Sequence, residues 1–378
     1  MKRVALNLLY LVPREVGGTE VYARRLVHEL ARARPDVEWV VFAGTEAAPS
    51  LAAEGWPDPV RIVRVPLRAR IKPARVGFEM AVLPALAARE RADLLHSFGT
   101  TSPLFGRVPR VVTIHDLIFR HYRGDFPLAS RLALDALVPL GGRRADRVIV
   151  YSQATKRDVV AECRVDAAKV DVVPLGPGMR DFDATPEGEL RDRLDLGQAP
   201  VVLTVAPPLP HKNLDRLLEA HRTLGSMEPA PVLVLVGHGG RKGERLRARI
   251  AELGLEDRVR ITGWISDEDL EGLYRITACC AYPSLYEGFG LPVLEAMRRG
   301  APVACSDATS LPEVVGDAAE LFDPHDAGAI AAAVRRVLED ERLTADLVER
   351  GRRRAAEFTW ERTAQGTLES YERAIAAS

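Results

Sequence analysis

The chain has 378 residues, more than one compact hydrophobic core usually holds, so two domains are expected. Apolar residues make up 47%, charged residues 28%, and the formal net charge is −1, which is the profile of an ordinary soluble globular protein. The near-neutral charge disfavours a dedicated nucleic-acid-binding protein, because such proteins usually carry a basic excess.

The chain opens with an apolar run that superficially resembles a short signal peptide and ends at Pro13-Arg14-Glu15. It lacks a small-residue cleavage site, so a buried first strand of a parallel sheet explains it better. No window approaches the roughly 18 apolar residues of a membrane span. We therefore expect a cytoplasmic protein, at most in peripheral contact with the inner face of the membrane.

Short β-branched runs alternate with longer Ala-, Leu- and Arg-rich stretches through the first half of the chain. The runs predict strands at Val37–Ala43, Val60–Val65, Ala92–His96, Val111–His115 and Arg147–Tyr151. The longer stretches predict helices at Thr19–Arg34, Val76–Arg91 and Ser130–Ala145. Because the strands are apolar almost throughout, we expect a parallel sheet covered by helices on both faces.

The pattern restarts after a strand at Lys169–Pro174, and the polar passage 175–189 is the best linker candidate. Strands are then predicted at Val201–Ala206, Pro231–Gly237, Val259–Thr262, Ala278–Pro283 and Pro302–Cys305. Helices are predicted at Asn213–Leu224, Glu244–Leu253 and Asp267–Tyr274, and helices dominate towards the end. Two open α/β sheets in tandem place a ligand in the cleft between them, at the carboxyl ends of the strands.

The four cysteines show neither a CxxC pair nor histidines at a spacing suited to zinc. We interpret them as small packing residues in a reducing compartment. We interpret no acidic cluster as a metal-binding motif of the Asp-x-Asp kind, so we expect no metal and no cofactor.

The densest chemical signal is the segment 283–297, in which an apolar strand ends at Pro283 and a helix begins near Leu291. Gly288 and Gly290 let the backbone approach a ligand closely, and the free amides of the helix start favour a phosphate or diphosphate. Glu287 and Glu295 are suited to accept hydrogen bonds from sugar hydroxyls. The alternative is a glycine-rich turn with two solvated glutamates, one of them a favourable charge at the helix N-terminus.

Glu287 and Glu295, with seven residues between them, resemble the paired-glutamate motif of the retaining glycosyltransferases of family 4, which have the GT-B fold. The similarity continues through Gly263–Leu270, Ala301-Pro302-Val303 and Ser310–Ala319 and covers nearly the whole chain. It implies two Rossmann-like parallel-sheet domains facing each other across a cleft. The expected parts are an acceptor domain at 1–176, a donor domain at 177–358 and a final helix at 359–378 that crosses back to the first domain.

The resemblance also assigns roles on the donor side. Glu287 would face the donor sugar, and Glu295 would hold the ribose. Backbone amides of Gly288, Phe289, Gly290 and Leu291 would surround the sugar and phosphates, and the strand at Arg260-Ile261-Thr262 would border the base.

Lys212, in the segment Pro210–Leu214, would bind the donor diphosphate and stabilise the charge that grows on the leaving nucleotide. Many family members have Gly-Arg where this chain has Ala206-Pro207, and many have Arg where it has His211. One expected cation is therefore absent or replaced by a weaker one. The alternative for Lys212 is an ordinary surface lysine at a helix start.

In the amino-terminal half, Gly17 and Gly18 follow the first strand and begin a helix, without the spacing of a dinucleotide fingerprint. The resemblance suggests that this loop approaches the donor phosphates or the acceptor, and a plain strand-to-helix turn is the alternative. His115 and Asp116 stand at a strand's carboxyl end, where family members often have His-Asp. His115 could orient a sugar hydroxyl or relay the acceptor proton, and His96 is a weaker candidate.

No acid occurs from Arg61 to Phe78, a stretch whose cations reach from Arg61 to Arg75. It is either a solvated surface or a basic face for an anionic or lipid-linked acceptor at a membrane. In the family, the acceptor binds to the amino-terminal domain, so this basic stretch is a candidate acceptor-binding surface.

The resemblance implies transfer of a hexose with retention of anomeric configuration, and no residue is an obvious nucleophile. We expect front-face attack through an oxocarbenium-like ion pair. The expected donor is a nucleotide sugar, for which the resemblance favours GDP-mannose, and the expected acceptor is a sugar, lipid-linked or small-molecule acceptor. Two alternatives stay open. One is a nucleotide-sugar epimerase on the same fold, and the other is a nucleotide-sugar-binding protein with weak or no catalysis.

Overall fold

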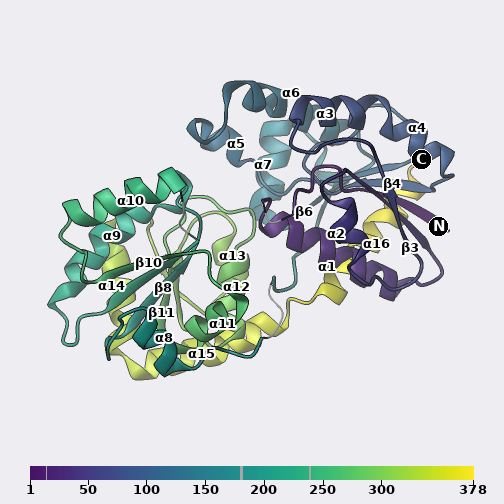
Figure 1. The fold of residues 1–378 in the computed structure, drawn as a ribbon. Helices are drawn as coiled ribbons and strands as arrows, with labels where there is room; N and C mark the ends of the chain where they lie inside the picture. The colour runs from purple at the N-terminus through teal and green to yellow at the C-terminus, as the bar shows by residue number, and fades with distance from the viewer. Residues whose placement is uncertain (14, 179–181, 238–239) are drawn as a thin grey trace. The chain divides into compact units, whose positions relative to one another are not determined.

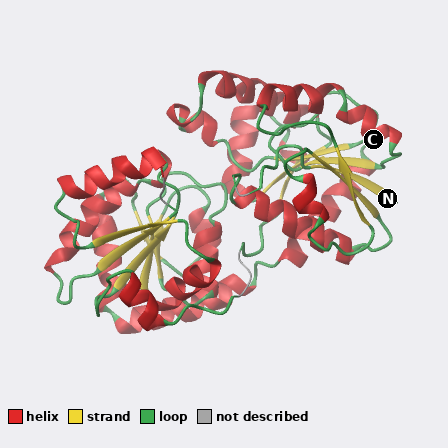
Figure 2. Ribbon diagram, in the orientation of Figure 1, coloured by secondary structure: helices red, strands yellow, loops and turns green. Residues whose placement is uncertain are grey.

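The computed structural model describes residues 1–13, 15–178, 182–237 and 240–378. The chain divides into two compact units. Unit 1 comprises Met1–Gly176 and Phe358–Ser378, and unit 2 comprises Pro177–Glu357. Each unit is a parallel sheet with helices on both faces (Figures 1 and 2).

The sheet of unit 1 has seven strands in the order β3-β2-β1-β4-β5-β6-β7, and every neighbouring pair is parallel. The order runs outward from β1 in one direction and from β4 in the other, so β1 and β4 flank the topological switch point. The strands are β1 (Arg3–Asn7), β2 (Glu38–Ala43), β3 (Val60–Arg64), β4 (Leu94–Ser97), β5 (Arg110–Thr113), β6 (Arg147–Val150) and β7 (Val170–Val172).

The helices of unit 1 pack apolar side chains on this sheet. Leu83 and Ala87 meet Val40 and Phe42 in one buried cluster. The helices are α1 (Gly18–Ala33), α2 (Ala48–Ala52), α3 (Lys72–Ala81), α4 (Leu83–Arg89), α5 (Ile118–His121), α6 (Leu128–Arg144), α7 (Gln153–Cys163), α16 (Trp360–Ala376) and the 3₁₀ turns η1 (Arg123–Asp125) and η2 (Ala167–Lys169).

The last helix, α16, is part of unit 1 although it ends the chain. Thr363 Oγ1 donates to the Pro174 carbonyl at 2.8 Å, and Ser370 Oγ donates to Asp171 at 2.8 Å. Trp360 packs so closely on Gly176 that a Cβ there would lie 2.6 Å from the indole. Hydrogen bonds and packing thus connect α16 to residues that precede it by nearly 200 positions in the sequence.

The sheet of unit 2 has six parallel strands in the order β10-β9-β8-β11-β12-β13, so β8 and β11 flank its switch point. The strands are β8 (Val201–Val205), β9 (Val232–Val236), β10 (Val259–Gly263), β11 (Thr277–Tyr282), β12 (Val303–Ser306) and β13 (Glu320–Phe322). The helices are α8 (Glu187–Arg193), α9 (Leu214–Thr223), α10 (Gly240–Glu252), α11 (Asp267–Ile276), α12 (Leu291–Arg298), α13 (Leu311–Val315), α14 (Ala327–Glu339), α15 (Glu341–Ala356) and the turns η3 (Pro210–Lys212) and η4 (Leu224–Ser226).

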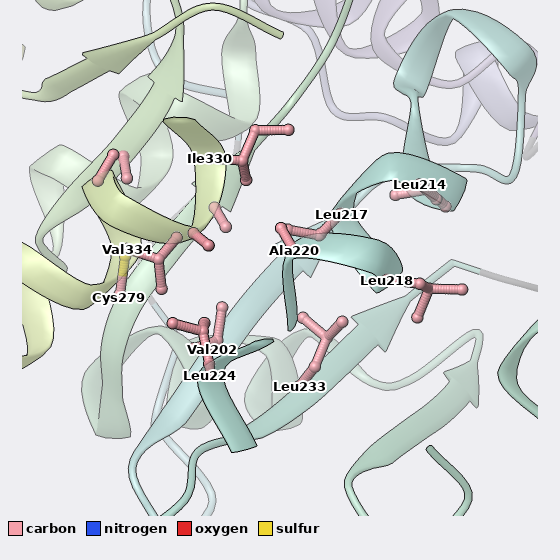
Figure 3. Close-up of a cluster of buried hydrophobic side chains, with 14 of the residues drawn as sticks. Val202, Leu214, Leu217, Leu218, Ala220, Leu224, Leu233, Cys279, Ile330 and Val334 are labelled. Carbon is pink, nitrogen blue, oxygen red and sulfur yellow. The ribbon is translucent and has the colours of Figure 1, made fainter. Parts of the chain in front are cut away.

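The core of unit 2 is an apolar cluster between α9, α14 and one face of the sheet (Figure 3). Leu218 and Leu233 are completely buried in it, as are Cys279 and Ile330. All four cysteines of the chain are buried and unpaired, which agrees with their expected role as packing residues.

Several details differ from the sequence predictions, which also lacked strand β13 and the short helices α2 and α5. The single helix expected at Val76–Arg91 is two helices, α3 and α4, because Pro84 has no N–H for the preceding turn and its ring crowds that turn's carbonyl. Helix α7 was not predicted. The expected linker 175–189 runs into α8 at its end, and it includes residues 179–181, which lie outside the described residues.

Within the described part of the chain, no helix combines the length and the apolar character needed to cross a bilayer.

Candidate functional site

The loop between β11 and α12 is hydrogen-bonded to residues that follow β12. The backbone N–H of Glu287 donates to Thr309 Oγ1 at 3.0 Å, and the Ser310 hydroxyl lies 3.0 and 2.8 Å from the carbonyl oxygens of Glu287 and Phe289. Thr309 has φ 53°, a left-handed conformation that is unusual for a β-branched residue. Backbone strain of this kind is often found at functional sites.

Gly290 ends the loop and provides the N-cap of α12 with φ 117°. A Cβ at this position would lie 2.6 Å from Leu311 Cδ2, so only glycine fits both the dihedral angle and the space. Leu291 and Pro292 then begin α12 as the sequence predicted. The loop follows β11, which flanks the switch point of the sheet, so the N-terminus of α12 lies where α/β folds bind ligands.

The Lys212 turn lies beside this loop. Leu285 N–H donates to the His211 carbonyl at 2.7 Å, and the Asn213 side-chain amide donates to the Pro283 carbonyl at 3.1 Å. Asn213 has φ 56° and connects η3 to α9. The turn follows β8 and the loop follows β11, which are adjacent strands, so parallel pairing brings the two segments together.

An ion pair joins the two segments directly: Lys212 Nζ lies 2.6 Å from Glu287 Oε1. The side chains are only 14% and 12% exposed. Burial raises the pKa of the Glu287 carboxyl, but the charge of Lys212 and hydrogen bonds from Lys212 and Ser284 outweigh it, so the pKa lies below its ordinary value. Glu287 is therefore an ionised, oriented carboxylate at neutral pH.

Glu295 lies in the second turn of α12 and is 8% exposed. The Tyr274 hydroxyl donates to its Oε2 over 3.4 Å. The Arg299 guanidinium lies 5.2 Å from the centre of the Tyr274 ring and donates to Glu271 at 2.6 Å. Tyr274 was not among the predicted site residues, because only the fold brings α11 against α12.

The remaining donor-side candidates lie on β10, the edge strand of unit 2. Ile261 packs against the core, and Thr262 Oγ1 lies 3.3 Å from the carbonyl oxygen of Gly263. Gly263 in turn accepts a hydrogen bond from Gly237 N–H at 2.8 Å. Ile261, Thr262 and Gly263 lie at the end of β10, whereas Lys212 and Glu287 follow β8 and β11.

In unit 1, Gly17 caps α1 with φ 57°, and a side chain there would meet nothing within 4 Å. Gly18 is the first residue of α1. The Tyr10 hydroxyl donates to the Thr19 carbonyl at 2.9 Å and so ties this turn to the end of β1. The turn follows a strand at the switch point, which is where α/β folds bind ligands.

His115 lies two residues beyond the end of β5, not in the strand as predicted. Its Nδ1 is 2.6 Å from the Tyr151 hydroxyl, which follows the neighbouring strand β6. Burial lowers the pKa of His115 to about 4, and the Phe98 carbonyl opposes part of that effect. Asp116 Oδ1 accepts a hydrogen bond from Ile118 N–H at 3.0 Å and so starts α5. His115 is thus a neutral imidazole at pH 7.

Part of the basic stretch Arg61–Arg75 is neutralised by acids from other segments. Arg61 pairs with Glu38 and Glu90, and Arg70 pairs with Glu15. Arg68 makes no ion pair with the described residues. It lines a hollow of about 470 Å³ after β2 and β3, together with Thr45, Glu46, Arg70 and Ile71.

One group of metal-ligand type occurs among the described residues, formed by His121, Asp158 and Glu162 in unit 1. Its ligand atoms lie within 4.8 Å of one another. His121 Nε2 is already 3.0 Å from Glu162 Oε1, and Arg120 lies 3.8 Å from the same carboxylate. The nearby guanidinium makes this position unfavourable for a cation.

The structure therefore brings together Glu287, Lys212, the backbone of His211 and the residues from Gly288 to Leu291. Thr309, Ser310 and Tyr274 support them and were missed. Ser310 lies in a stretch that carried the family resemblance, so a role for its hydroxyl could have been sought there. A left-handed Thr309 leaves no sign in the sequence.

Comparison with known proteins identifies the family of this chain. Residues 187–354 match the family described as Glycosyl transferases group 1, and residues 16–176 match Glycosyltransferase Family 4. MMP alpha-(1->4)-mannosyltransferase of Mycolicibacterium hassiacum is 32% identical, over 99% of this chain and 98% of that protein. D-inositol 3-phosphate glycosyltransferase of Salinispora arenicola is 31% identical, over 96% of this chain and 88% of that protein.

The solved structure of Anabaena HepE in complex with UDP-glucose is similar in fold, with a TM-score of 0.75 at 22% identity, over 98% of this chain and 100% of that one. The two Rossmann-like parallel-sheet units are those of the GT-B fold. The chain belongs to the group 1, family 4 glycosyltransferases and is itself a glycosyltransferase.

Proposed function

We propose that the protein transfers a hexose from a nucleotide-diphosphate sugar to a hydroxyl acceptor, with retention of configuration and without a metal ion. The observation that carries the proposal is the Lys212–Glu287 ion pair beside the N-terminus of α12. An ammonium group has three hydrogen-bond donors, and Glu287 occupies one. The others are available to diphosphate oxygens, whose charge grows as the nucleotide leaves.

In the reaction, the bond from the anomeric carbon to the phosphate oxygen breaks, and a bond to the acceptor oxygen forms on the same face. The departing phosphate takes the acceptor's proton, so no protein base is required. Glu287 would hold the donor sugar and Glu295 the ribose. Ile261 and Thr262 would border the base, and Gly17 and Gly18 would approach the phosphates. His115 would lie beside the reacting sugar and orient one of its hydroxyls.

GDP-mannose is the donor we favour, because the relative from Mycolicibacterium hassiacum is named a mannosyltransferase. The Anabaena structure holds UDP-glucose, which makes a UDP-sugar the second candidate. Thermal unfolding with GDP-, UDP- and dTDP-sugars discriminates between them, since a bound donor raises the melting temperature by mass action.

On the acceptor side, the hollow that contains Arg68 supports an acceptor with an anionic group. The inositol 3-phosphate in the name of the second relative is such an acceptor. An anionic lipid-linked acceptor would bring the same face to a membrane. Binding to vesicles containing an anionic lipid, compared for wild type and Arg68→Ala, tests that extension.

The central test compares Glu287→Gln and Lys212→Ala with a matched control. Both should reduce transfer from the donor by at least about 100-fold, as loss of a group that stabilises transition-state charge does, while far-UV circular dichroism stays unchanged. Glu339→Gln alters a glutamate of a surface ion pair, 54% exposed, and should keep full activity. Near-normal turnover in both site variants would refute the assignment.

A non-catalytic nucleotide-sugar-binding protein is the alternative, supported by Ala206-Pro207 and His211 where many family members have cations. Slow release of nucleotide from the donor in the absence of acceptor supports the enzyme. Tight donor binding with no release supports the binding protein.

A further inference from the structure

Helix α6 is apolar on its outer side as well as on the side that faces the core. Val138 is buried in an apolar cluster of unit 1. On the outer side, Leu128 and Leu132 are 61% and 57% exposed, and Leu140 is exposed as well. These three positions and the exposed Ala136 follow one another at intervals of four residues, so they lie along one side of the helix. A surface helix usually turns a polar face to water, and α6 does not.

Phe105 and the start of α4 continue this surface. Phe105 is 68% exposed, and the guanidinium of Arg144, the last residue of α6, lies 5.9 Å from the centre of its ring. A Cβ on Gly106 would lie 3.5 Å from Pro84 Cβ in α4, and Val82, two residues before that proline, is exposed. Helices α6 and α4 both lie along the upper edge of unit 1 in Figure 1. We call this surface the apolar ridge, and its residues are Val82, Phe105, Leu128, Leu132 and Leu140.

Exposed large apolar side chains gather at the ridge. Eight such side chains are exposed among the described residues, and five of them form the ridge. Ile71 belongs to the same unit, whereas Trp264 and Leu321 belong to unit 2. Single exposed apolar residues are ordinary on a protein surface, but a group of this size marks a surface that a partner or a membrane covers.

The charged side chains beside the ridge are arginines. Arg107, Arg143 and Arg144 are exposed, and none of them forms an ion pair within the described part of the chain. Asp135 is the one acid of α6, and it pairs with Arg120 at 3.4 Å. The ridge is therefore apolar along its length and positively charged where the end of α6 meets Phe105.

An anionic bilayer fits this combination better than a second copy of the chain does. In a twofold dimer the ridge would meet itself, and the arginines of both copies would be buried with no acid of the ridge to pair with them. At a bilayer, leucine and phenylalanine side chains enter the apolar zone below the headgroups, and guanidinium groups bind lipid phosphates. Charge complementarity therefore favours a membrane as the partner.

We propose that the apolar ridge is a membrane-docking surface, which places α6 in the interface of an anionic bilayer with Leu128, Leu132 and Leu140 facing the acyl chains. The ridge shares no residue with the hollow that contains Arg68, so it is separate from the acceptor surface proposed there. The inference goes beyond the proposed function and does not rest on the identity of the donor. Under that function, docking through unit 1 would give the enzyme access to a lipid-linked acceptor.

Co-sedimentation of the full chain with vesicles tests the docking. The wild type should bind vesicles made of equal parts phosphatidylglycerol and phosphatidylcholine, and it should bind phosphatidylcholine vesicles at least about tenfold more weakly, because these carry no net charge. High salt should weaken binding to the anionic vesicles. Leu128→Ser/Leu132→Ser should reduce this binding at least about tenfold, because two apolar side chains no longer leave water.

Two controls in unit 2 match the ridge variants. Leu321→Ser alters an exposed leucine of β13 and should bind vesicles as the wild type does. Arg143→Gln/Arg144→Gln should weaken binding to anionic vesicles about tenfold, whereas Arg245→Gln/Arg353→Gln, which alters two exposed arginines of unit 2, should not. Unchanged far-UV circular dichroism and melting temperature show that the variants are folded.

A tryptophan reporter identifies the surface that meets the bilayer. Lipids with brominated acyl chains quench an indole that lies among them. Leu132→Trp should therefore lose more fluorescence than the wild type when such anionic vesicles are added. Leu321→Trp should lose no more than the wild type.

Three results would overturn the inference: no binding of the wild type to anionic vesicles, unchanged binding of Leu128→Ser/Leu132→Ser, or loss of binding in Arg68→Ala alone. The last would move the contact to the hollow. In sedimentation equilibrium, a wild-type dimer that becomes a monomer in the leucine variant would show that a second copy covers the ridge, and this would also overturn it. Failure of the proposed donor chemistry would leave the vesicle measurements unaffected, so the two proposals are tested separately.

Discussion

Lys212 and Glu287 meet across the switch point of the sheet in unit 2, with Nζ and Oε1 2.6 Å apart. They come from turns that follow the adjacent strands β8 and β11, separated by 75 residues in sequence. Because the pair is mostly buried, each charge depends on the other for its stability. The same contact therefore stabilises the fold and, under the proposed function, presents a cation and a carboxylate to the donor.

Replacing Lys212 by Met leaves the Glu287 carboxylate buried without its cation. We expect the free energy of unfolding at pH 7 to fall by about 2 kcal/mol, less than for a fully buried pair because both groups retain some exposure. The double variant Lys212→Met/Glu287→Gln should be more stable than Lys212→Met, since it removes the unpaired charge.

The loss should also depend on pH. In the wild type the folded-state pKa of Glu287 is depressed, so its stabilising effect is fully present above the unfolded pKa, about 4.3, and is lost as the pH falls through the folded value. Urea unfolding at pH 7 and at pH 3.5 should therefore show the two proteins converging in stability at the lower pH. A difference that is the same at both pH values contradicts the assigned pairing.

Gly290→Ala should destabilise unit 2 strongly. The substitution forces an L-residue to φ 117° and places its Cβ 2.6 Å from Leu311 Cδ2, so we expect a loss of about 3 kcal/mol. Gly254→Ala is the matched control, because Gly254 also has a positive φ, 64°, but nothing lies within 4 Å of its Cβ position. That variant should cost about 1 kcal/mol. If both variants lose the same free energy of unfolding in chemical denaturation, the Leu311 side chain moves aside at no energetic cost.

Most of the fold could be predicted from the alternation of apolar strands and amphipathic helices, since each run carries its own period. The boundary at Val82 was missed because Pro84 was treated as part of one helix, although proline disfavours the helical interior. Helix α7 was missed although Ser152 provides an N-cap that accepts a hydrogen bond from Thr155 N–H, and its Val159 and Cys163 pack in the apolar cluster with Val148 and Val170.

The candidate site was predicted residue by residue but not as a set of contacts. Glu287 was assigned to the donor sugar and Lys212 to the donor diphosphate, yet their pairing requires knowledge that β8 and β11 are neighbours. The contact between His115 and Tyr151 depends in the same way on the pairing of β5 with β6. Such pairings are non-local, and single-sequence patterns carry no register for them.

Arg299 and Arg275 both pair with Glu271, and the difference between them is burial. The Arg299 and Glu271 side chains are each 4% exposed, whereas the Arg275 side chain is 57% exposed. Arg299→Met should reduce the free energy of unfolding by about 3 kcal/mol, because it leaves the buried Glu271 carboxylate with only the exposed Arg275 as its cation. Arg275→Met should cost less than about 1 kcal/mol, as exposed pairs do.

The same two variants test whether Arg299 helps to hold the candidate donor site in place. Arg299 also lies over the Tyr274 ring, whose hydroxyl contacts Glu295. We expect Arg299→Met to weaken donor binding several-fold in titration calorimetry and Arg275→Met to leave it unchanged. Equal donor affinity in all three proteins would show that Tyr274 keeps its place without Arg299.

His221 should make unit 2 sensitive to acid. Burial, with a smaller effect from the charge of Arg258, lowers its pKa to about 4, and its Nε2 lies 3.2 Å from the Arg258 carbonyl. Between this value and the unfolded pKa of about 6.5, the unfolded chain binds a proton that the folded chain does not. Stability is therefore full above about pH 6.5 and is lost as the pH falls towards 4.

The loss attributable to His221 over this window is on the order of 3 kcal/mol, at 1.36 kcal/mol per pKa unit. His221→Gln keeps a side-chain N–H for the Arg258 carbonyl and removes the titrating group, so its unfolding free energy should depend less on pH between 4 and 6.5. NMR titration of the His221 ring in the wild type gives the direct measurement. A midpoint near 6.5 would mean that the ring is hydrated, and the stability of the variant and of the wild type would then fall in parallel.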